Sequence, residues 1–137
     1  MLNLKPLNDR IAVAPQIAPE DMKALAEQGY TLVINNRPDG EEPGQPTSAE
    51  MKAAAQAAGL TYAHVPVERG IGPSDVADMQ EALAQCSSGK TLAFCRSGTR
   101  STMLWAVARA DKGDDRAELE RCAESAGYSL APVSHLL

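Results

Sequence analysis

The stretch TLAFCRSGTRSTML, residues 91–104, changes character abruptly and decides the fold. Its first five residues are mostly apolar and predict a buried strand over 91–95 that ends in a cysteine. The next residues are rich in Gly, Ser, Thr and Arg, which predicts a turn, and residues 100–110 then predict a helix. A strand that turns directly into a helix is the building unit of α/β proteins.

The rest of the chain repeats this alternation. Because strands alternate with helices, we expect an α/β fold with three αβα layers around a mostly parallel central sheet. The length of 137 residues predicts one domain over residues 1–137. The last ten residues show no clear pattern. The other strands are predicted at 10–16, 31–35 and 60–67, and the other helices at 19–29, 47–59, 74–89 and 114–127.

Composition and charge argue against several classes of function. The net charge of -5 disfavours general nucleic-acid binding, because phosphate backbones require a basic face. No apolar run reaches membrane-spanning length, and the first ten residues lack the apolar stretch of a signal peptide. We therefore expect a cytoplasmic protein without a membrane partner. The three cysteines form no CxxC pair, which predicts free thiols, and no residue spacing predicts a metal site or another cofactor.

Cys95 is expected at the sheet edge where α/β proteins bind ligands, because it ends its strand. The turn around Gly98 and the first N–H groups of the following helix would surround its sulfur and form an anion cradle. The same field favours the thiolate, and Arg100 adds positive charge. We interpret Cys95 as a nucleophile in an anion-binding loop. The loop consists of Arg96, Ser97, Gly98 and Thr99.

The motif CRSGTRS, residues 95–101, resembles the active loops of two enzyme families. Rhodanese-type sulfurtransferases often have loops of this length and composition. Protein tyrosine and dual-specificity phosphatases have five residues between the catalytic cysteine and arginine. Only four residues separate Cys95 from Arg100, and Ser101 occupies the position that the phosphatase arginine would take.

Separated motifs resemble one bacterial family more specifically. The segments VINNRPDGEEPGQP (33–46), AAAQAAGLTYAHVPV (53–67) and CRSGTRSTMLWA (95–106) are similar, in this order, to the beta-lactamase-hydrolase-like, phosphatase-like domains (DUF442). The resemblance covers roughly residues 3 to 110. The Asp-Val-Arg and Gly-His-Ile-Pro-Gly-Ala motifs of rhodaneses are missing. The resemblance implies a tyrosine or dual-specificity phosphatase-like fold that carries a loop of rhodanese length.

The departures from the phosphatase pattern bear on the chemistry. Hydrolysis of a phosphate monoester needs a thiolate, an arginine fork and an acid that protonates the leaving alkoxide. Glu68 and Asp75 are the candidate acids, but Arg69 occupies the place of the phosphatase aspartate. Sulfur transfer needs no such acid, because sulfite leaves a thiosulfate-like donor without a proton.

The leading hypothesis is a sulfurtransferase that forms a persulfide on Cys95 and passes the sulfur to a thiol acceptor. Arg100 and Arg69 are expected near the donor, and Ser101 is expected to donate a hydrogen bond to the thiolate. Arg37 either binds substrate or, as we favour, pairs with Glu41 or Asp39. One alternative is a phosphatase that hydrolyses phosphate monoesters through a phosphocysteine. The other is a non-catalytic redox or persulfide sensor.

Four further residues are expected to be structural. His64 lies in a predicted strand and Trp105 in a predicted helix, so both are assigned to the core. Cys86 and Cys122 are predicted to pack as small apolar side chains.

Overall fold

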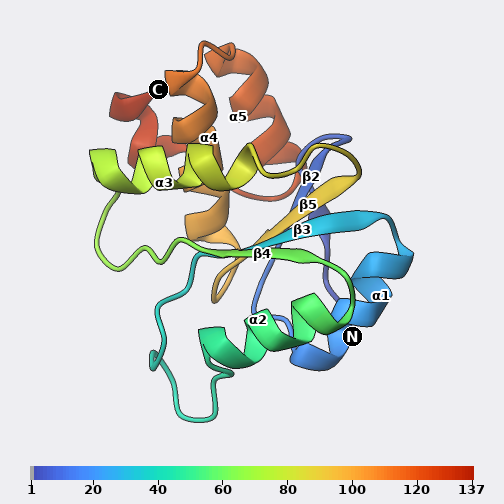
Figure 1. Cartoon of the computed structure of the whole chain (residues 1–137). Coiled ribbons are helices and arrows are strands. Elements are labelled where there is room, and N and C mark those ends of the chain that lie inside the picture. The colour runs from blue at the N-terminus through green and yellow to red at the C-terminus, as the bar shows by residue number, and fades with distance from the viewer. Residues whose placement is uncertain (1) are drawn as a thin grey trace.

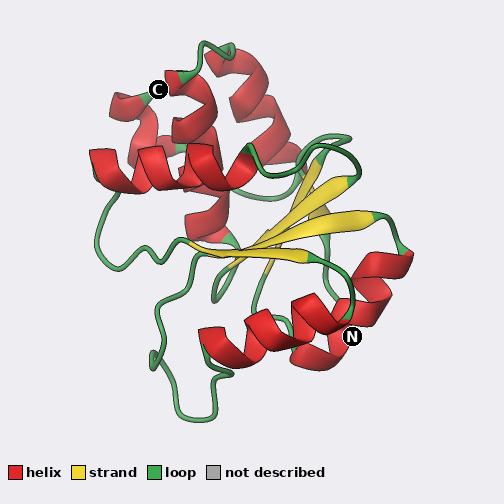
Figure 2. Cartoon of the chain, in the orientation of Figure 1, coloured by secondary structure: helices red, strands yellow, loops and turns green. Residues whose placement is uncertain are grey.

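The computed structural model describes residues 2–137, and a five-stranded sheet lies at its centre between two layers of helices (Figures 1 and 2). The strands have the order β1-β2-β5-β3-β4, and only the pair β1–β2 is antiparallel. This confirms the predicted three-layer α/β fold. The strands are β1 (Lys5–Pro6), β2 (Ile11–Ala14), β3 (Tyr30–Asn35), β4 (Thr61–His64) and β5 (Lys90–Phe94).

The helices divide between the two faces of the sheet (Figure 1). Helices α1 (Met22–Glu27) and α2 (Ser48–Ala57) cover one face, and α3 (Pro73–Leu83), α4 (Thr99–Asp111) and α5 (Arg116–Ser125) cover the other. Successive side chains along a strand point to opposite faces, which gives each layer its own core. In β3, Leu32 and Ile34 therefore pack in one core, whereas Val33 packs in the other. Within residues 2–137, no helix has the length and apolarity needed to span a membrane.

Several predicted boundaries differ from the observed ones. The strand predicted over 60–67 ends at His64. Pro66 has no N–H to donate to the ladder, although Val65 N and Val67 N still donate to carbonyls of β3 and its extension. The helix predicted over 74–89 ends at Leu83, because its last residues turn into β5. The strand β1 and the 3-10 helix Ala131–Leu136 were not predicted.

Candidate active site at the carboxyl edge of the sheet

The carboxyl ends of four parallel strands meet at one edge of the sheet. Cys95 follows β5, which lies between β2 and β3 at the centre of the sheet. Gln16 follows β2 and Arg37 follows β3, and both side chains turn toward the same loop through the contacts described below. Such an edge is the usual ligand-binding position of an open α/β sheet.

The loop after β5 wraps tightly around the sulfur of Cys95. The Cys95 side chain is fully buried, and its Sγ accepts a hydrogen bond from the backbone N–H of Gly98 at 3.1 Å. Gly98 has a φ of 90°, which favours glycine, and α4 begins at the next residue. Thr102 Oγ1 donates to Gly98 O at 2.8 Å and holds the turn against the helix. The N-terminal end of α4 and one inward N–H are thus directed at the sulfur.

Tyr128, which lies beyond α5, closes the other side of this loop. Its hydroxyl donates a hydrogen bond to Ser97 O at 2.9 Å, and it lies so close to Gly98 that a Cβ at position 98 would collide with it. Burial raises the pKa of Tyr128, and the nearby Cys95 sulfur acts in the same direction. Glycine is therefore required at position 98 both by its backbone angle and by the phenol that packs on it.

Arg100 is held by a carboxylate from the loop between β3 and α2. Its Nη1 and Nη2 donate to the two carboxylate oxygens of Glu41 at 2.7 and 2.8 Å, and Nη1 also donates to Val67 O at 2.8 Å. Chiefly because Arg100 donates to it, the pKa of Glu41 falls from its usual 4.5 to about 2. The same pairing raises the pKa of Arg100, with a smaller contribution from Cys95. Arg100 thus lies near Cys95 with its guanidinium group held in place by Glu41.

A second arginine, Arg37, also donates to the carboxylate of Glu41. Arg37 is buried, and its Nε donates to Glu41 Oε1 at 2.8 Å while its Nη1 donates to Gln16 Oε1 at 3.0 Å. Its Nη2 lies 3.5 Å from Glu42 but makes no hydrogen bond there, and Glu42 also pairs with the exposed Arg96 at 2.6 Å. The predicted pairing of Arg37 with a nearby acid is present, and the partner is Glu41 rather than Asp39. Three arginines and two glutamates thus surround the Cys95 loop.

Not every predicted site residue joins this cluster. Glu68 and Arg69 are exposed in the loop between β4 and α3, and in the described residues neither contacts the Cys95 loop through a hydrogen bond or ion pair. Asp75 accepts the Gly72 N–H at 2.9 Å and so caps its own helix. Ser101 is fully buried, but its hydroxyl has no hydrogen-bond partner within residues 2–137, so the expected bond to Cys95 is not observed.

The rest of the loop is polar and exposed. Ser97 Oγ donates to Thr99 Oγ1 at 2.9 Å, so these two predicted anion-binding side chains contact each other. In residues 2–137, no group of three or more His, Cys, Asp or Glu side chains is placed to hold a metal ion.

One structural expectation is wrong, and two residues of the site were missed. His64 is not a core residue: it is exposed at the end of the edge strand β4, with Nε2 2.9 Å from Arg37 O. Glu41 was expected only as a possible partner of Arg37, and Gln16 and Tyr128 were not proposed at all. The glutamate lies in the acidic, Pro- and Gly-rich segment 36–46.

Comparison with known proteins agrees with this geometry. The family model described as "Beta-lactamase hydrolase-like protein, phosphatase-like domain" matches residues 3–112. A beta-lactamase hydrolase-like protein of Agrobacterium fabrum is 35% identical over 133 residues, which is 96% of this chain and 31% of that protein. The chain thus spans about a third of the length of this relative.

Solved structures give the same assignment. A crystal structure of a candidate phosphatase from Neisseria meningitidis has 35% sequence identity and a TM-score of 0.78, and the match covers 95% of this chain and 93% of that one. A kinase associated phosphatase with its catalytic-site cysteine replaced by serine shares the fold at 15% identity, with a TM-score of 0.71 over 93% of this chain and 83% of that chain. The fold is therefore that of the tyrosine and dual-specificity phosphatases, and the chain belongs to the family of beta-lactamase hydrolase-like, phosphatase-like domains.

Proposed function

We propose that the chain is a cysteine-dependent sulfurtransferase that carries sulfur as a persulfide on Cys95. One observation carries the proposal. The Cys95 sulfur accepts an N–H in a short anion cradle, while the candidate acids Glu68 and Asp75 are exposed or engaged in capping a helix. This arrangement supplies a nucleophile but no general acid. Sulfur transfer needs only the nucleophile, whereas hydrolysis of an alkyl phosphate also needs the acid.

In the first step, the Cys95 thiolate attacks the outer sulfur of a thiosulfate-like donor. A bond forms between Cys95 Sγ and this sulfur, the sulfur–sulfur bond of the donor breaks, and its electron pair leaves with sulfite. No proton is needed by the leaving group. The terminal sulfur of the persulfide then occupies the cradle, where the Gly98 N–H and the N-terminal end of α4 stabilise its negative charge.

In the second step, the thiol of an acceptor loses its proton to solvent and attacks the terminal sulfur. The acceptor becomes a persulfide, and the electron pair of the broken bond returns to Cys95 as a thiolate. The mechanism is therefore ping-pong, and neither step requires an external oxidant or reductant. Because the Cys95 side chain is buried, neighbouring side chains must move for the donor to reach Sγ and for the acceptor to reach the terminal sulfur of the persulfide.

The ion pairs around the loop also favour sulfur transfer over the binding of a phosphoryl group. The fork of Arg100 is filled by Glu41, and the arginines Arg37, Arg96 and Arg100 face the two carboxylates of Glu41 and Glu42. A phosphate dianion that required this fork would have to displace Glu41. Thiosulfate is also a dianion and would meet the same pair, but the persulfide that remains after sulfite leaves carries its charge on one sulfur inside the cradle.

The test is the intact mass of the reduced protein after incubation with thiosulfate, beside Cys95→Ser. We expect the wild type alone to gain one sulfur atom, and an added acceptor thiol to remove it. If the wild type gains no sulfur, or if Cys95→Ser gains it equally, the proposal is wrong.

The second candidate is a phosphatase that acts on phosphate monoesters. The fold and the likeness to a Neisseria meningitidis candidate phosphatase favour it, as does an arginine that already binds a carboxylate through two nitrogens. It predicts hydrolysis of an aryl phosphate, whose leaving group needs little protonation, and inhibition by vanadate. If neither occurs at high protein concentration while sulfur is transferred, the second candidate is excluded.

A further inference from the structure

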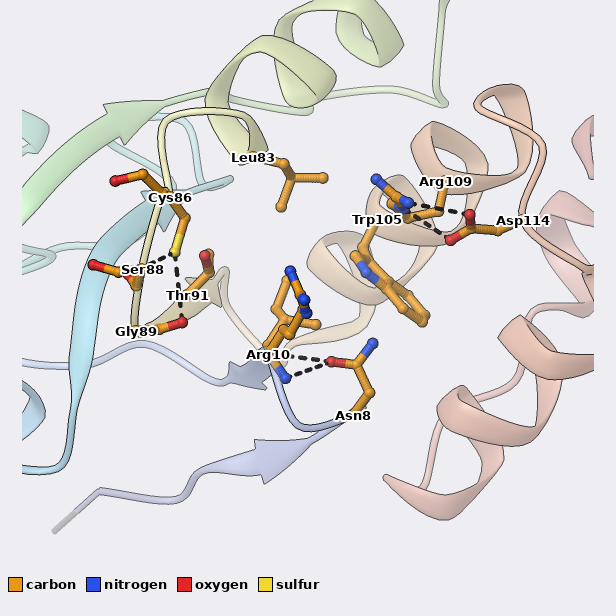
Figure 3. A pocket seen from close by; sticks show the side chains of 12 residues that line it. Asn8, Arg10, Leu83, Cys86, Ser88, Gly89, Thr91, Trp105, Arg109 and Asp114 are labelled. Atoms are coloured by element: carbon orange, nitrogen blue, oxygen red, sulfur yellow. Dashed lines mark hydrogen bonds and ion pairs between the residues drawn. The ribbon is translucent and has the colours of Figure 1, made fainter.

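A cavity of about 660 Å³ lies at the opposite edge of the sheet, away from Cys95 (Figure 3). Its walls come from the turn before β2, the start of β5, the segment after α3 and the side of α4. The volume is within the range of small-molecule sites in proteins. None of its lining residues takes part in the chemistry proposed for Cys95.

The polar groups around this cavity are mostly hydrogen-bond donors. Arg10 is exposed at the mouth of the cavity and makes no ion pair with any residue in the described part of the chain, whereas Arg109 is neutralised by Asp114, with nitrogen–oxygen distances of 2.8 and 3.1 Å. Asn8 Oδ1 already accepts the N–H groups of Arg10 and Ile11, which leaves its NH₂ group as a donor. The two arginines and one aspartate therefore leave one uncompensated positive charge.

Two almost fully buried side chains add donors that have no partner. Trp105 is 3% exposed and Thr91 is 4% exposed, and both line the cavity. Within residues 2–137, neither the indole N–H nor the threonine hydroxyl makes a hydrogen bond, yet neither atom is sealed from the cavity space. Figure 3 shows the indole nitrogen on the edge of the ring that faces the cavity. Both donors therefore open onto the cavity space, where an acceptor of a ligand can take the place of water.

We propose that this cavity binds a small organic carboxylate. Arg10 supplies the unpaired positive charge, and the indole N–H of Trp105 and the hydroxyl of Thr91 supply neutral donors for the carboxylate oxygens. The ring of Trp105 and the side chains of Ile11 and Leu83 provide an apolar wall for the body of the ligand. A neutral ligand would leave the charge of Arg10 unused, and an inorganic anion would leave the apolar wall uncovered.

Trp105 is the only tryptophan in the chain, so one indole N–H resonance reports on the cavity. The experiment titrates the isotope-labelled full chain with sodium benzoate at constant ionic strength and follows this resonance. We expect a saturable shift of the indole N–H, while benzamide, the neutral isostere, causes little change. Arg10→Gln should weaken benzoate binding by about tenfold or more, because a charge-assisted contact is lost.

Arg116→Gln is the matched control, because it removes the same charge from an exposed site that does not line the cavity. Its benzoate affinity should stay within about twofold of the wild type. The proposal is wrong if the indole resonance does not shift, if benzamide or inorganic phosphate shifts it as strongly, or if Arg10→Gln binds as well as the wild type. If the Gly98 amide resonance shifts while the indole N–H resonance does not, the carboxylate binds at the Cys95 loop and not in this cavity.

Discussion

The two edges of the sheet each carry a cysteine, but the surrounding dipoles have opposite orientations. At the carboxyl edge, Cys95 Sγ accepts an N–H from Gly98. At the amino edge, Cys86 Sγ lies 3.3 Å from Ser88 O and 3.8 Å from Gly89 O, so it faces carbonyl oxygens and acts as a donor. The first environment thus offers the sulfur a hydrogen-bond donor, and the second offers it only acceptors.

The cations differ in the same way. Arg37, Arg96 and Arg100 around Cys95 are all paired with glutamates, whereas Arg10 at the amino edge is unpaired in the described structure. The carboxyl edge holds one buried sulfur in a closed loop, whereas the amino edge has an open cavity. The direction of the local dipoles therefore distinguishes the two thiols more clearly than the arginines near them.

The largest expected effect comes from removing the sulfur that faces the N–H. We expect Cys95→Ser to lower sulfur transfer by about 10³-fold or more, because the nucleophile is lost. Cys122→Ser, the matched control, should keep the wild-type rate: burial, followed by Glu118, raises the pKa of the Cys122 thiol and keeps it protonated. Peptide mapping of the thiosulfate-treated wild type should place the added sulfur on Cys95 and none on Cys86. Sulfur on Cys86 would overturn the comparison.

Distortion of the cradle should come next. Gly98→Ala adds a Cβ that collides with Tyr128 at a φ of 90°, whereas Gly113→Ala adds one at a φ of 101° with nothing within 4 Å. The control should lose about 1 kcal/mol of unfolding free energy from backbone strain alone. Gly98→Ala should lose about 3 kcal/mol, since overpacking adds to the strain, and most of its activity. Equal losses of stability in denaturant unfolding would show that Tyr128 does not constrain the loop.

A smaller effect is expected from replacing the arginine fork. Arg100→Lys keeps the charge but loses the two-nitrogen contact with Glu41, so the cation near Cys95 is no longer fixed. We expect the KM for thiosulfate to rise by about tenfold. Arg109→Lys breaks a similar two-nitrogen pair at the other edge and should leave this KM unchanged. Steady-state kinetics give the KM for thiosulfate of both variants. If the KM rises equally in Arg100→Lys and Arg109→Lys, the effect comes from a loss of stability and not from the arginine near Cys95.

The smallest effect is a pH dependence at the carboxyl edge. The pKa of Glu41 in the folded protein is about 2, against a usual value of 4.5. The contribution of its charge to the free energy of unfolding is therefore complete above pH 4.5 and is lost as the pH falls toward 2. Glu41→Gln should therefore lower the free energy of unfolding near neutral pH by about 1 kcal/mol or less, which is measured as a lower urea midpoint. The difference from the wild type should shrink in acid. A difference that stays constant with pH would mean that the Glu41 charge does not stabilise the fold.

Local sequence features predicted the parts of the fold that depend on local physics. The buried runs of β3 and β5 and the Gly-rich turn before α4 are encoded in adjacent residues, and they were sufficient to place Cys95. The two-residue strand β1 was not predictable, because it contains a proline and depends on pairing with β2. The predicted C-terminus of α3 extended too far, because the six residues after Leu83 are compatible with a helix until tertiary packing redirects them.

The residues of the Cys95 loop were predicted from the sequence, but the distant residues that contact this loop were not. Arg96, Arg100 and Gly98 are close to Cys95 in sequence, so their proximity followed from the turn. Glu41 and Tyr128 reach the loop from segments that are distant in the chain, and no local pattern indicates such a contact. The helix-capping role of Asp75 became visible only with the Gly72 N–H in place, since an acid near a helix start also fits a catalytic role.

The contact of Tyr128 with the Cys95 loop has a consequence for how this domain can be inherited. The family match ends at residue 112, yet the donor to the Ser97 carbonyl lies 16 residues further along. A recombination event that kept only the matched segment would transfer the nucleophile without the phenol that fixes its loop. The structural unit that holds the Cys95 loop therefore extends at least to Tyr128, beyond the segment that the family model matches.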